Sequence, residues 1–288
     1  MDLSVITVTW NSKDIIGRQI KSVFSGFKRI SAEEIVVDNA SADGTVDFIK
    51  QEFSNLKLIA NEDNLGFATA NNLGTAVASG DYLLFLNPDM KVTVGSLDVM
   101  VEWMKKKPEV GIVSCKLVDE QGKFNFNAGP RRFPGLFDQL MILLKIPHIF
   151  PFVLNKYLMK NFDPDIEQEV NSVRGAFLLM RRELYEKMGF AFDPRYFFWF
   201  EDVDTCREAK RLGYKVVYNP IVSCVDYVGQ SFKKRDSLWK QKNFTASMIK
   251  YFQKWEPWYC WITLFLLRPF IIVFAWLNEK IKINRTRI

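Results

Sequence analysis

The hydrophobic pattern of the first ninety residues alternates between two periods. Four short, apolar and β-branched runs have the length of buried strands: residues 3–10, 33–39, 56–61 and 82–89. The segments between them carry apolar residues at helical spacing and predict helices at residues 13–27, 45–53 and 68–78. Strands that alternate with short helices form right-handed β-α-β crossovers. The pattern therefore predicts an α/β fold with a mostly parallel sheet covered by helices on both faces.

Polar side chains stand at the end of each predicted strand. Asn11 follows the first strand, Asp38 and Asn39 end the second, Asn61 ends the third and Asp89 ends the fourth. Each of them alone is explained by capping of the next helix. In open α/β sheets, however, ligands bind beyond the carboxyl ends of the strands. The coincidence of four polar strand ends favours a binding site at this edge of the sheet.

The sequence lacks the glycine motifs that hold phosphates in the common nucleotide-binding folds. No G-x-G-x-x-G follows the first strand, and no G-x-x-x-x-G-K-[ST] occurs anywhere. A nucleotide is still bound without them if side chains recognise the base and a divalent cation bridges the phosphates. Asp89, which follows Asn87-Pro88 at the end of an apolar strand, is the expected ligand of such a cation.

The composition of the chain excludes several classes of functional site. The chain has 288 residues, 48% of them apolar, which is enough for one large domain or two small ones. The single histidine, His148, excludes sites that need two histidines and leaves a Ser-His-Asp hydrolase only if His148 is its base. The four cysteines are far apart and form no C-x-x-C pair. They support neither a disulfide framework nor a zinc knuckle, and we expect reduced thiols in a cytosolic protein.

Six strings along the chain resemble, in order, the family 2 glycosyltransferases of the GT-A fold and their rhamnosyltransferase-like branch. They are VTWN, VVDNASADGT, NEDNLGFATANN, LFLNPD, RGAFLLMRR and FFWFEDVDTCREAKRLGYK. One such string would be weak, but six in order are specific. The resemblance implies a GT-A domain at residues 1–232, with a nucleotide-sugar-binding half at 1–90 and an acceptor-binding, catalytic half at 91–232.

The resemblance also implies an activity. An inverting glycosyltransferase of this branch moves a sugar, with rhamnose from dTDP-rhamnose as the leading candidate, to a hydroxyl of a glycan or lipid-linked glycan in cell-surface polysaccharide synthesis. Two alternatives stay open: a synthase that loads a sugar onto a polyprenyl phosphate, and a non-catalytic nucleotide-binding scaffold. The donor nucleotide stays open between UDP and dTDP, because a carboxylate accepts a hydrogen bond from uracil and thymine alike.

The donor-site residues follow from the same resemblance. Asp38 is expected to accept from the N3–H of the pyrimidine. The other residues implied in the nucleotide-sugar pocket are Thr9, Asn11, Asn64, Gly66, Asn71 and Asn87. Arg131, Arg132 and Arg174 are cationic candidates near the diphosphate. Arg174 is preferred, because the small pair that follows it, Gly175-Ala176, indicates a close approach of the backbone.

The metal ligands are implied by two acidic positions. Asp89 corresponds to the metal-binding member of the family's D-x-D-like motif, in which Asn87 here replaces the first carboxylate. Asp226 stands where the family often has a histidine, ahead of a turn at residues 229–231. A carboxylate is a good ligand for a hard cation, so Asp226 is expected either to help bind Mg²⁺ or Mn²⁺ or to be an ordinary turn residue.

Glu201 and Asp202 are the expected catalytic residues. An inverting transfer needs a carboxylate that takes the proton of the acceptor hydroxyl. The resemblance assigns this base to Asp202 and a positioning role to Glu201. As an alternative, both acids only complement the dipole of a helix at residues 203–212. The aromatic run at 196–200 favours catalysis, because rings exclude water and offer a surface on which a sugar can stack.

The C-terminal segment differs from the rest in charge and composition. From residue 229 to the end there are 12 Lys/Arg and 3 Asp/Glu, in a chain of net charge +6, and tryptophans and phenylalanines are interspersed. This mixture favours an anionic membrane surface over nucleic acid. We therefore predict a helical membrane-associating tail at residues 233–288 and no nucleic-acid partner.

Two apolar segments complete the prediction. Residues 258–277 are long enough to span a bilayer, which takes about 20 apolar residues. Arg268-Pro269 interrupts them, and an arginine at mid-depth costs roughly 2.5 to 3.5 kcal/mol, so a kinked in-plane hairpin is favoured. No signal peptide is expected, which predicts a peripheral or monotopic protein at the cytoplasmic face of the membrane. Residues 136–154 are expected to line the acceptor entrance or to form a core helix pair.

Overall fold

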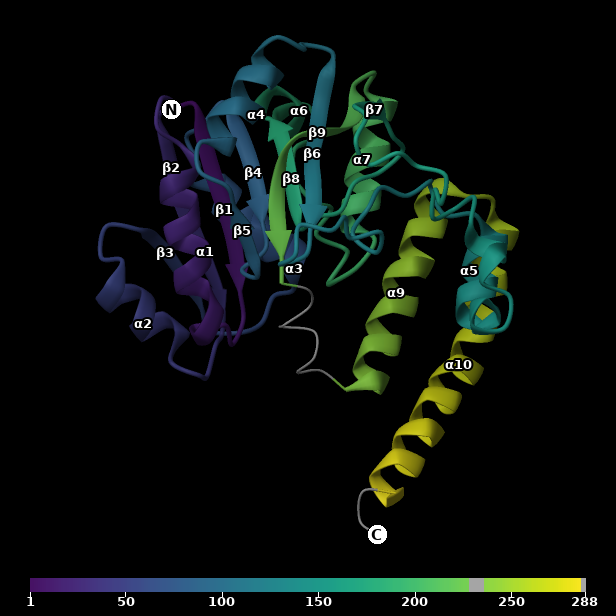
Figure 1. Cartoon of the computed structure of the whole chain (residues 1–288). Coiled ribbons are helices and arrows are strands. Elements are labelled where there is room, and N and C mark those ends of the chain that lie inside the picture. Colours follow the sequence, from purple (N-terminus) through teal and green to yellow (C-terminus); the bar gives the residue numbers. More distant parts are fainter. Residues whose placement is uncertain (228–235, 286–288) are drawn as a thin grey trace.

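The computed structural model describes residues 1–227 and 236–285 (Figure 1). Its strands are β1 (Leu3–Thr9), β2 (Ala32–Asn39), β3 (Lys57–Asn61), β4 (Tyr82–Leu86), β5 (Met90–Val92), β6 (Val110–Val118), β7 (Gln168–Glu169), β8 (Phe177–Arg181) and β9 (Lys215–Asp226). Its α-helices are α1 (Lys13–Gly26), α2 (Thr45–Glu52), α3 (Phe67–Ala76), α4 (Ser96–Lys105), α5 (Leu136–Leu143), α6 (Arg182–Met188), α7 (Glu201–Arg211), α9 (Ser237–Trp255) and α10 (Trp258–Arg285). Two short 3₁₀ helices, η1 (Ile146–His148) and η2 (Pro151–Leu154), follow α5.

The strands form one mixed sheet with the order β3-β2-β1-β4-β8-β6-β9-β5, and β7 pairs with β9. The first four strands are parallel, as their hydrophobic pattern predicted. Strand β8 is antiparallel to both of its neighbours, β4 and β6, and so joins the parallel N-terminal half to the C-terminal half. The carboxyl ends of β1 to β4 therefore lie along one edge of the sheet.

The predicted elements of the first ninety residues are confirmed, with small changes at their ends. The fourth strand ends at Leu86 rather than at residue 89, because Asn87 and Pro88 turn the chain into the short strand β5. Helix α7 begins at Glu201, two residues earlier than predicted, so both candidate catalytic acids lie in its first turn. The four cysteines are free thiols and all are buried.

Helices cover both faces of the sheet. On one face, Leu97, Met100 and Val101 of α4 pack against the apolar side chains of the central strands. On the other face, the core is built by α3, α6, α7 and also by α9, whose Met248 and Phe252 are fully buried. Helix α9 is therefore packed as part of the α/β body, although it follows residue 232. A division of the chain at residue 232 stays a prediction.

The C-terminal helices form a hairpin whose turn is not where the sequence suggested. Helix α10 continues through Pro269 as one helix, and the chain reverses direction between Trp255 and Trp258, at the end of α9. The prediction of a hairpin within residues 258–277 is therefore wrong. Arg268, half-buried, donates from Nε to Oγ1 of Thr245 on α9 at 3.2 Å, so this charge is directed at the body of the protein.

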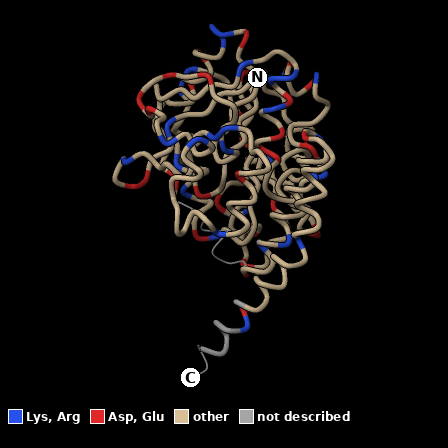
Figure 2. Tube along the Cα trace, turned by 90° about the vertical axis from the view of Figure 1, so that its right-hand side faces the viewer, with Lys and Arg blue, Asp and Glu red and all other residues tan. Residues whose placement is uncertain are grey.

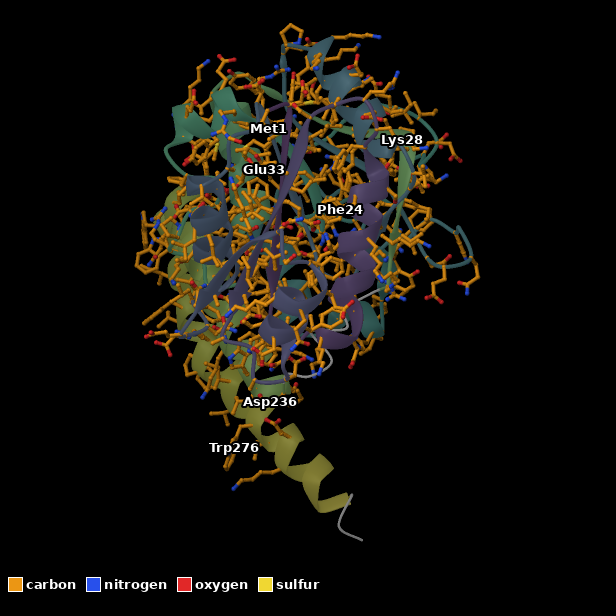
Figure 3. All side chains as sticks on the ribbon, turned by 90° about the vertical axis from the view of Figure 1, so that its left-hand side faces the viewer. Met1, Phe24, Lys28, Glu33, Asp236 and Trp276 are labelled. Atoms are coloured by element: carbon orange, nitrogen blue, oxygen red, sulfur yellow. The ribbon has the colours of Figure 1, made fainter. Side chains whose placement is uncertain are left out.

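The far half of α10 projects from the body. Figure 2 shows this part free of charged residues until the last turns. Figure 3 places Trp276 at the end of the molecule opposite Met1. The segment Trp258–Leu277 has a mean hydropathy of 2.1, and among the described residues it is the one helix long and apolar enough to cross a membrane.

Candidate functional site

The polar ends of the parallel strands lie next to one another. Thr9 pairs in register with Asp38, and Asn39 pairs with Asn61. Because parallel strands end at the same edge, the four strand ends predicted from sequence converge on one region.

Asp38 organises the loop that follows β2. Its Oδ1 and Oδ2 accept from the hydroxyl and the backbone N–H of Ser41 at 2.5 and 2.8 Å. Ser41 Oγ in turn accepts from the backbone N–H of Asn11 at 2.7 Å, and Oδ1 of Asn11 accepts from the N–H of Ala42 at 2.8 Å. Burial raises the pKa of Asp38, and the bonds from Ser41 oppose this only in part. These contacts tie the ends of β1 and β2 together, and each Asp38 oxygen retains a lone pair.

Thr9 lies beneath this loop with a fully buried side chain. Its hydroxyl has no hydrogen-bond partner among the described residues. A buried polar group without a partner costs about 1 to 3 kcal/mol, which a ligand that pairs with it would recover.

Gly66 joins the donor side of the sheet to the aromatic run before α7. A Cβ on Gly66 would lie 2.5 Å from the carbonyl oxygen of Phe197, and its φ of +83° favours glycine. The next residue, Phe67, donates its N–H to the same oxygen at 2.8 Å. Oδ1 of Asn64 accepts from the N–H of Gly66 at 3.0 Å, and Asn39 donates to the Gly66 carbonyl at 3.0 Å.

Two further predicted residues have clear local roles. Asn71 is buried within α3, where its amide donates to the Phe67 carbonyl at 2.9 Å. Asn87 donates its backbone N–H to Ala176 at 3.1 Å, and its carbonyl accepts from Met90 at 3.2 Å, which shapes the turn toward Asp89. Contacts of Asn71 and Asn87 with a nucleotide sugar stay predictions.

Asp202 is held at the first turn of α7 by two backbone donors. Its Oδ2 accepts from the N–H of Gly175 at 3.1 Å, and its Oδ1 accepts from the N–H of Val203 at 2.8 Å. A Cβ on Gly175 would lie 3.6 Å from the Asp202 side chain, so the small residue predicted to permit a close approach lies directly against this acid.

Glu201, unlike Asp202, has a carboxyl oxygen that accepts no hydrogen bond from the described residues. The side chain is buried, and Oε2 has no partner among the described residues. Burial, followed by the charge of Asp202, raises the pKa of Glu201 well above its usual range. At neutral pH Glu201 is therefore mostly a neutral carboxylic acid beside Asp202.

Two arginines lie close enough to the acidic pair for their charges to act on it. Arg174 is exposed and forms no ion pair within the described part of the chain. Arg131 donates to the carbonyl oxygens of Phe126 and Asn127 at 3.3 and 2.8 Å. Burial lowers the pKa of Arg131 to about 10, and the charge of Arg174 acts in the same direction. Two cations thus stand near each other and near Asp202, which favours an anionic ligand between them.

Asp89 and Asp226 are backbone neighbours at the end of the β5–β9 ladder. Met90 pairs with Asp226, and the Asp89 carbonyl accepts from the N–H of Tyr227 at 3.1 Å, so the two acids occupy neighbouring rungs. Asp226 also accepts from Nδ2 of Asn125 at 3.2 Å. Across residues 1–227 and 236–285, no cluster of three or more His, Cys, Asp or Glu side chains suits a metal. The turn at 229–231 lies outside the described residues.

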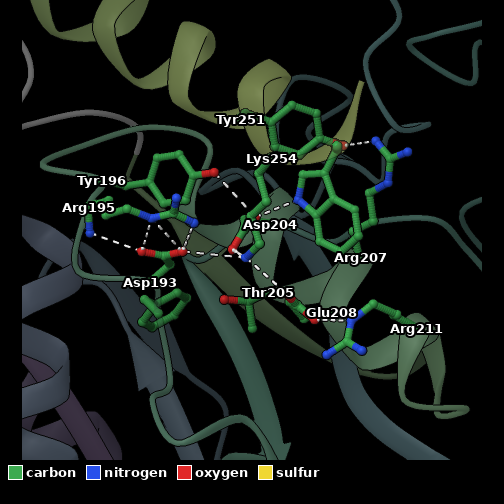
Figure 4. A network of polar contacts seen from close by, with 12 residues as sticks. Asp193, Arg195, Tyr196, Asp204, Thr205, Arg207, Glu208, Arg211, Tyr251 and Lys254 are labelled. Carbon is green, nitrogen blue, oxygen red and sulfur yellow. Dashed lines mark hydrogen bonds and ion pairs between the residues drawn. The ribbon is translucent and has the colours of Figure 1, made fainter. Parts of the chain in front are cut away.

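A buried ionic network behind α7 was not predicted from the sequence (Figure 4). Lys254 of α9 lies 2.8 Å from Asp204, 2.9 Å from Glu208 and 3.4 Å from Asp193. Trp255 donates from Nε1 to Asp204 at 2.6 Å. The helical spacing of buried residues on α9 indicates one packed face, but no sequence pattern specifies which carboxylates Lys254 meets.

Comparison with known proteins identifies a family and a relative with a similar sequence. Residues 4–189 match the family described as "Glycosyl transferase family 2". The N-acetylglucosaminyl-diphospho-decaprenol L-rhamnosyltransferase of Mycobacterium tuberculosis is 27% identical over 242 residues, covering 80% of this chain and 77% of the relative.

Two solved structures are similar in fold. The mannosyltransferase of Pyrobaculum calidifontis in complex with GDP-Man and Mn²⁺ superposes with a TM-score of 0.59 at 20% identity, covering 95% of this chain and 72% of the other. TarS 1–349 of S. aureus in complex with UDP-GlcNAc has a TM-score of 0.56 at 16% identity, covering 88% and 67% of the two chains. These likenesses confirm the GT-A-like α/β fold.

Proposed function

The chain belongs to glycosyl transferase family 2, and we propose that it transfers rhamnose from dTDP-rhamnose to a hydroxyl of a lipid-linked glycan. As a family member it is an inverting glycosyltransferase. The choice of rhamnose and of a lipid-linked acceptor is supported by the mycobacterial relative, whose name specifies an L-rhamnosyltransferase acting on a diphospho-decaprenol.

The arrangement of Asp202 and Glu201 carries the proposal. Asp202 is oriented by the N–H groups of Gly175 and Val203, and Glu201 beside it is buried with a raised pKa. In the proposed reaction the acceptor oxygen attacks the anomeric carbon while Asp202 takes the hydroxyl proton. The bond from the anomeric carbon to the diphosphate breaks, and the electron pair leaves with the diphosphate.

The donor is proposed to bind along the ends of β1 to β4. Asp38 accepts from the pyrimidine N3–H, and the unpartnered hydroxyl of Thr9 lies at the base of the same pocket. Asn11, Asn64 and Gly66 form the loops around it. In this assignment residues 1–90 supply the donor half, and residues 91–232 supply the acceptor half together with the packed helix α9.

A divalent cation is proposed to bind at Asp89 and Asp226, whose backbones are neighbours at the β5–β9 ladder. Mg²⁺ is usually held by one or two carboxylates, waters and the phosphates of the substrate, so two acids are enough on the protein side. A bound Mg²⁺ or Mn²⁺ would supply positive charge to the leaving diphosphate. Mn²⁺ is part of the Pyrobaculum complex, which supports this assignment. Arg174, and Arg131 beside it, are proposed to attract the same diphosphate or that of the acceptor.

We place the protein at the cytoplasmic face of the membrane. The support is the apolar helix α10 and the excess of Lys and Arg in the C-terminal segment. A lipid-linked acceptor makes this location useful, because the acceptor stays in the bilayer.

A donor and acceptor panel tests the proposed function. Purified protein is heated with dTDP-rhamnose, UDP-glucose, UDP-GlcNAc and GDP-mannose, with and without Mn²⁺, and thermal stabilisation identifies the donor. Turnover is then measured with a lipid-linked glycan and with polyprenyl phosphate. Transfer of rhamnose to the glycan hydroxyl is expected. Transfer to the phosphate would establish the synthase alternative, and binding without turnover of any donor would establish the scaffold.

A further inference from the structure

We propose that residues 136–154 and the outer face of α10 together form one docking surface for an anionic lipid bilayer. Residues 136–154, which comprise α5, η1 and η2, are called the insertion here. The role of this surface, which is to bring a lipid-linked acceptor to Asp202, rests on the proposed function, but its existence does not.

Helix α10 has two faces with different tasks. Its inner row, Cys260, Leu264, Arg268 and Ile271, packs against α9 and the core. The opposite row remains apolar and exposed, with Tyr259, Leu266, Phe270, Val273 and Leu277 at spacings of three, four and seven residues. An apolar outward face is unfavourable in water, because the burial of each exposed apolar side chain lowers the free energy.

The insertion presents a second set of apolar side chains. They are Phe137, Leu144, Ile149, Phe150 and Phe152, of which Ile149 is the most exposed at 71%. The expectation of a core helix pair is therefore wrong, because only Gln139, Leu143 and Leu154 of this segment are buried. The proline-broken 3₁₀ turns keep the side chains at the surface instead of folding them into the sheet core.

The two sets of side chains are neighbours, although more than a hundred residues separate them in sequence. Figure 1 shows α5 beside the first half of α10. Lys145, at the end of α5, places its ammonium group 4.9 Å from the ring centroid of Phe274 on α10. The exposed apolar rows of both segments therefore belong to one surface, and patches of this kind mark interaction sites.

The charges around this surface identify its occupant. Residues 136–160 contain Lys145, Lys156 and Lys160 but only one acid, Asp138, and all three lysines are exposed. The C-terminal segment adds its own excess of cations. Apolar and aromatic side chains with a cationic border match the hydrocarbon boundary and the anionic headgroups of a bilayer.

Backbone hydrogen bonds connect the two ends of the insertion with the segment that holds Asp202. Arg132 donates its N–H to the Tyr157 carbonyl at 3.1 Å, and Arg131 and Ser172 exchange backbone hydrogen bonds at 3.1 Å. Three residues after Ser172, the N–H of Gly175 holds Asp202. A bilayer bound by the insertion thus delivers the headgroup of an embedded acceptor to the side of the protein that carries Arg131 and Asp202.

Vesicle binding of the full chain tests the docking surface. The variant Ile149→Glu/Phe152→Glu is compared with Phe24→Glu/Ile221→Glu, which adds the same charges at exposed apolar positions on α1 and β9. Sedimentation with phosphatidylcholine vesicles containing about one-third phosphatidylglycerol gives the partition constant. We expect the insertion variant to bind at least about tenfold more weakly, and the control within about twofold of wild type. Unchanged melting temperature and UDP binding establish that the insertion variant is folded.

Other occupants give different results. If the insertion variant binds vesicles as wild type does, the insertion does not touch lipid and the proposal is overturned. If wild type is a dimer without vesicles and only the insertion variant is a monomer, with equal vesicle binding, the occupant is a second copy of the chain. Failure of the proposed function is seen separately: a wild type that binds vesicles through the insertion but turns over no donor retains the docking surface without the activity.

Discussion

The ammonium group of Lys254 lies 2.8 Å from a carboxylate oxygen of Asp204, and this ion pair joins α9 to the helix that begins with the candidate catalytic acids. Asp204 is fully buried and also accepts from Trp255 and Tyr196, while Ser247 on α9 donates to the Phe198 carbonyl at 2.7 Å. The C-terminal segment thus supports the first turn of α7 from behind. The position of Asp202 depends on a helix that sequence alone assigned to a separate tail.

Replacement of Lys254 tests this support. Lys254→Met leaves Asp204 buried without its cation, and removing one partner of a buried pair costs about 3 to 5 kcal/mol of unfolding free energy. Lys242→Met, on an exposed position of α9, is the matched control and is expected to change stability by less than about 0.5 kcal/mol. Urea denaturation measures both. Equal stability of Lys254→Met and wild type would mean that the pair contributes nothing.

Replacement of Asp202 tests the proposed base. Asp202→Asn keeps the size of the side chain but cannot take the acceptor proton, so turnover should fall by about 10² to 10⁴-fold while donor affinity changes little. Glu201→Gln is the companion variant and should retain most activity, because Glu201 is already protonated. Single-turnover rates and calorimetric donor affinities separate the two effects. Donor binding that weakens in parallel with turnover would assign Asp202 a structural role.

The metal assignment is tested at Asp89 and Asp226. Asp89→Ala is expected to abolish stimulation by Mn²⁺, and Asp226→Ala to weaken it, because each removes a carboxylate from the proposed donor set. Asp226→His should retain the stimulation, since imidazole also binds Mn²⁺. Activity is titrated with Mn²⁺ after chelation. An unchanged metal response in Asp226→Ala would leave Asp89 as the sole protein ligand.

Glu34 is expected to make stability depend on pH. Burial raises its pKa to about 8, with hydrogen bonds from Gln19 and Thr7 opposing the shift, whereas the unfolded value is 4.5. The native state therefore holds an extra proton between these values, and stability falls as pH rises from about 4.5 to 8, by on the order of 4 to 5 kcal/mol. Glu34→Gln should remove this decline. Denaturation at pH 5, 7 and 9 measures it.

The neighbouring Glu33 provides a control of opposite sign. Burial opposes ionisation there, but hydrogen bonds from Lys57, Ser79 and Ser4 outweigh it and lower the pKa to about 2. Its stabilisation is present above pH 4.5 and is lost as pH falls toward 2. Glu33→Gln should therefore destabilise the protein at neutral pH, whereas Glu34→Gln should not. The same direction for both variants would contradict the assignment.

Gly66 is expected to tolerate no side chain. Gly66→Ala places a methyl group 2.5 Å from the Phe197 carbonyl, which must displace either the donor loop or the aromatic run. Gly122 has a similar φ of +78° but open space around it, so Gly122→Ala carries the cost of a positive φ, about 1 kcal/mol, without a steric clash. Thermal unfolding and donor affinity are measured for both. Gly66→Ala should lose more stability than Gly122→Ala and should also weaken donor binding.

The sequence by itself determined the local elements and the edge that carries the site. Residues 3–8 are apolar except for Ser4 and Thr7, and residues 35–37 are apolar throughout, because both faces of a parallel strand are buried, and this is visible without a structure. The polar residues Asn11, Asp38 and Asp89 end such runs, and the parallel register brings strand ends to one edge as a matter of geometry. The resemblance to a family implied roles for these residues, and their position at the sheet edge is compatible with those roles.

Only the tertiary structure decided which distant segments meet. No local sequence pattern indicates that Lys254 pairs with Asp204, that Gly66 packs on Phe197, or that the insertion lies beside α10. Local patterns record which face of an element is apolar, because that face must avoid water whatever covers it. The partner of that face is chosen by packing of the whole chain, and the same apolar residues of α10 would suit a core, a second copy or a bilayer until their exposure is known.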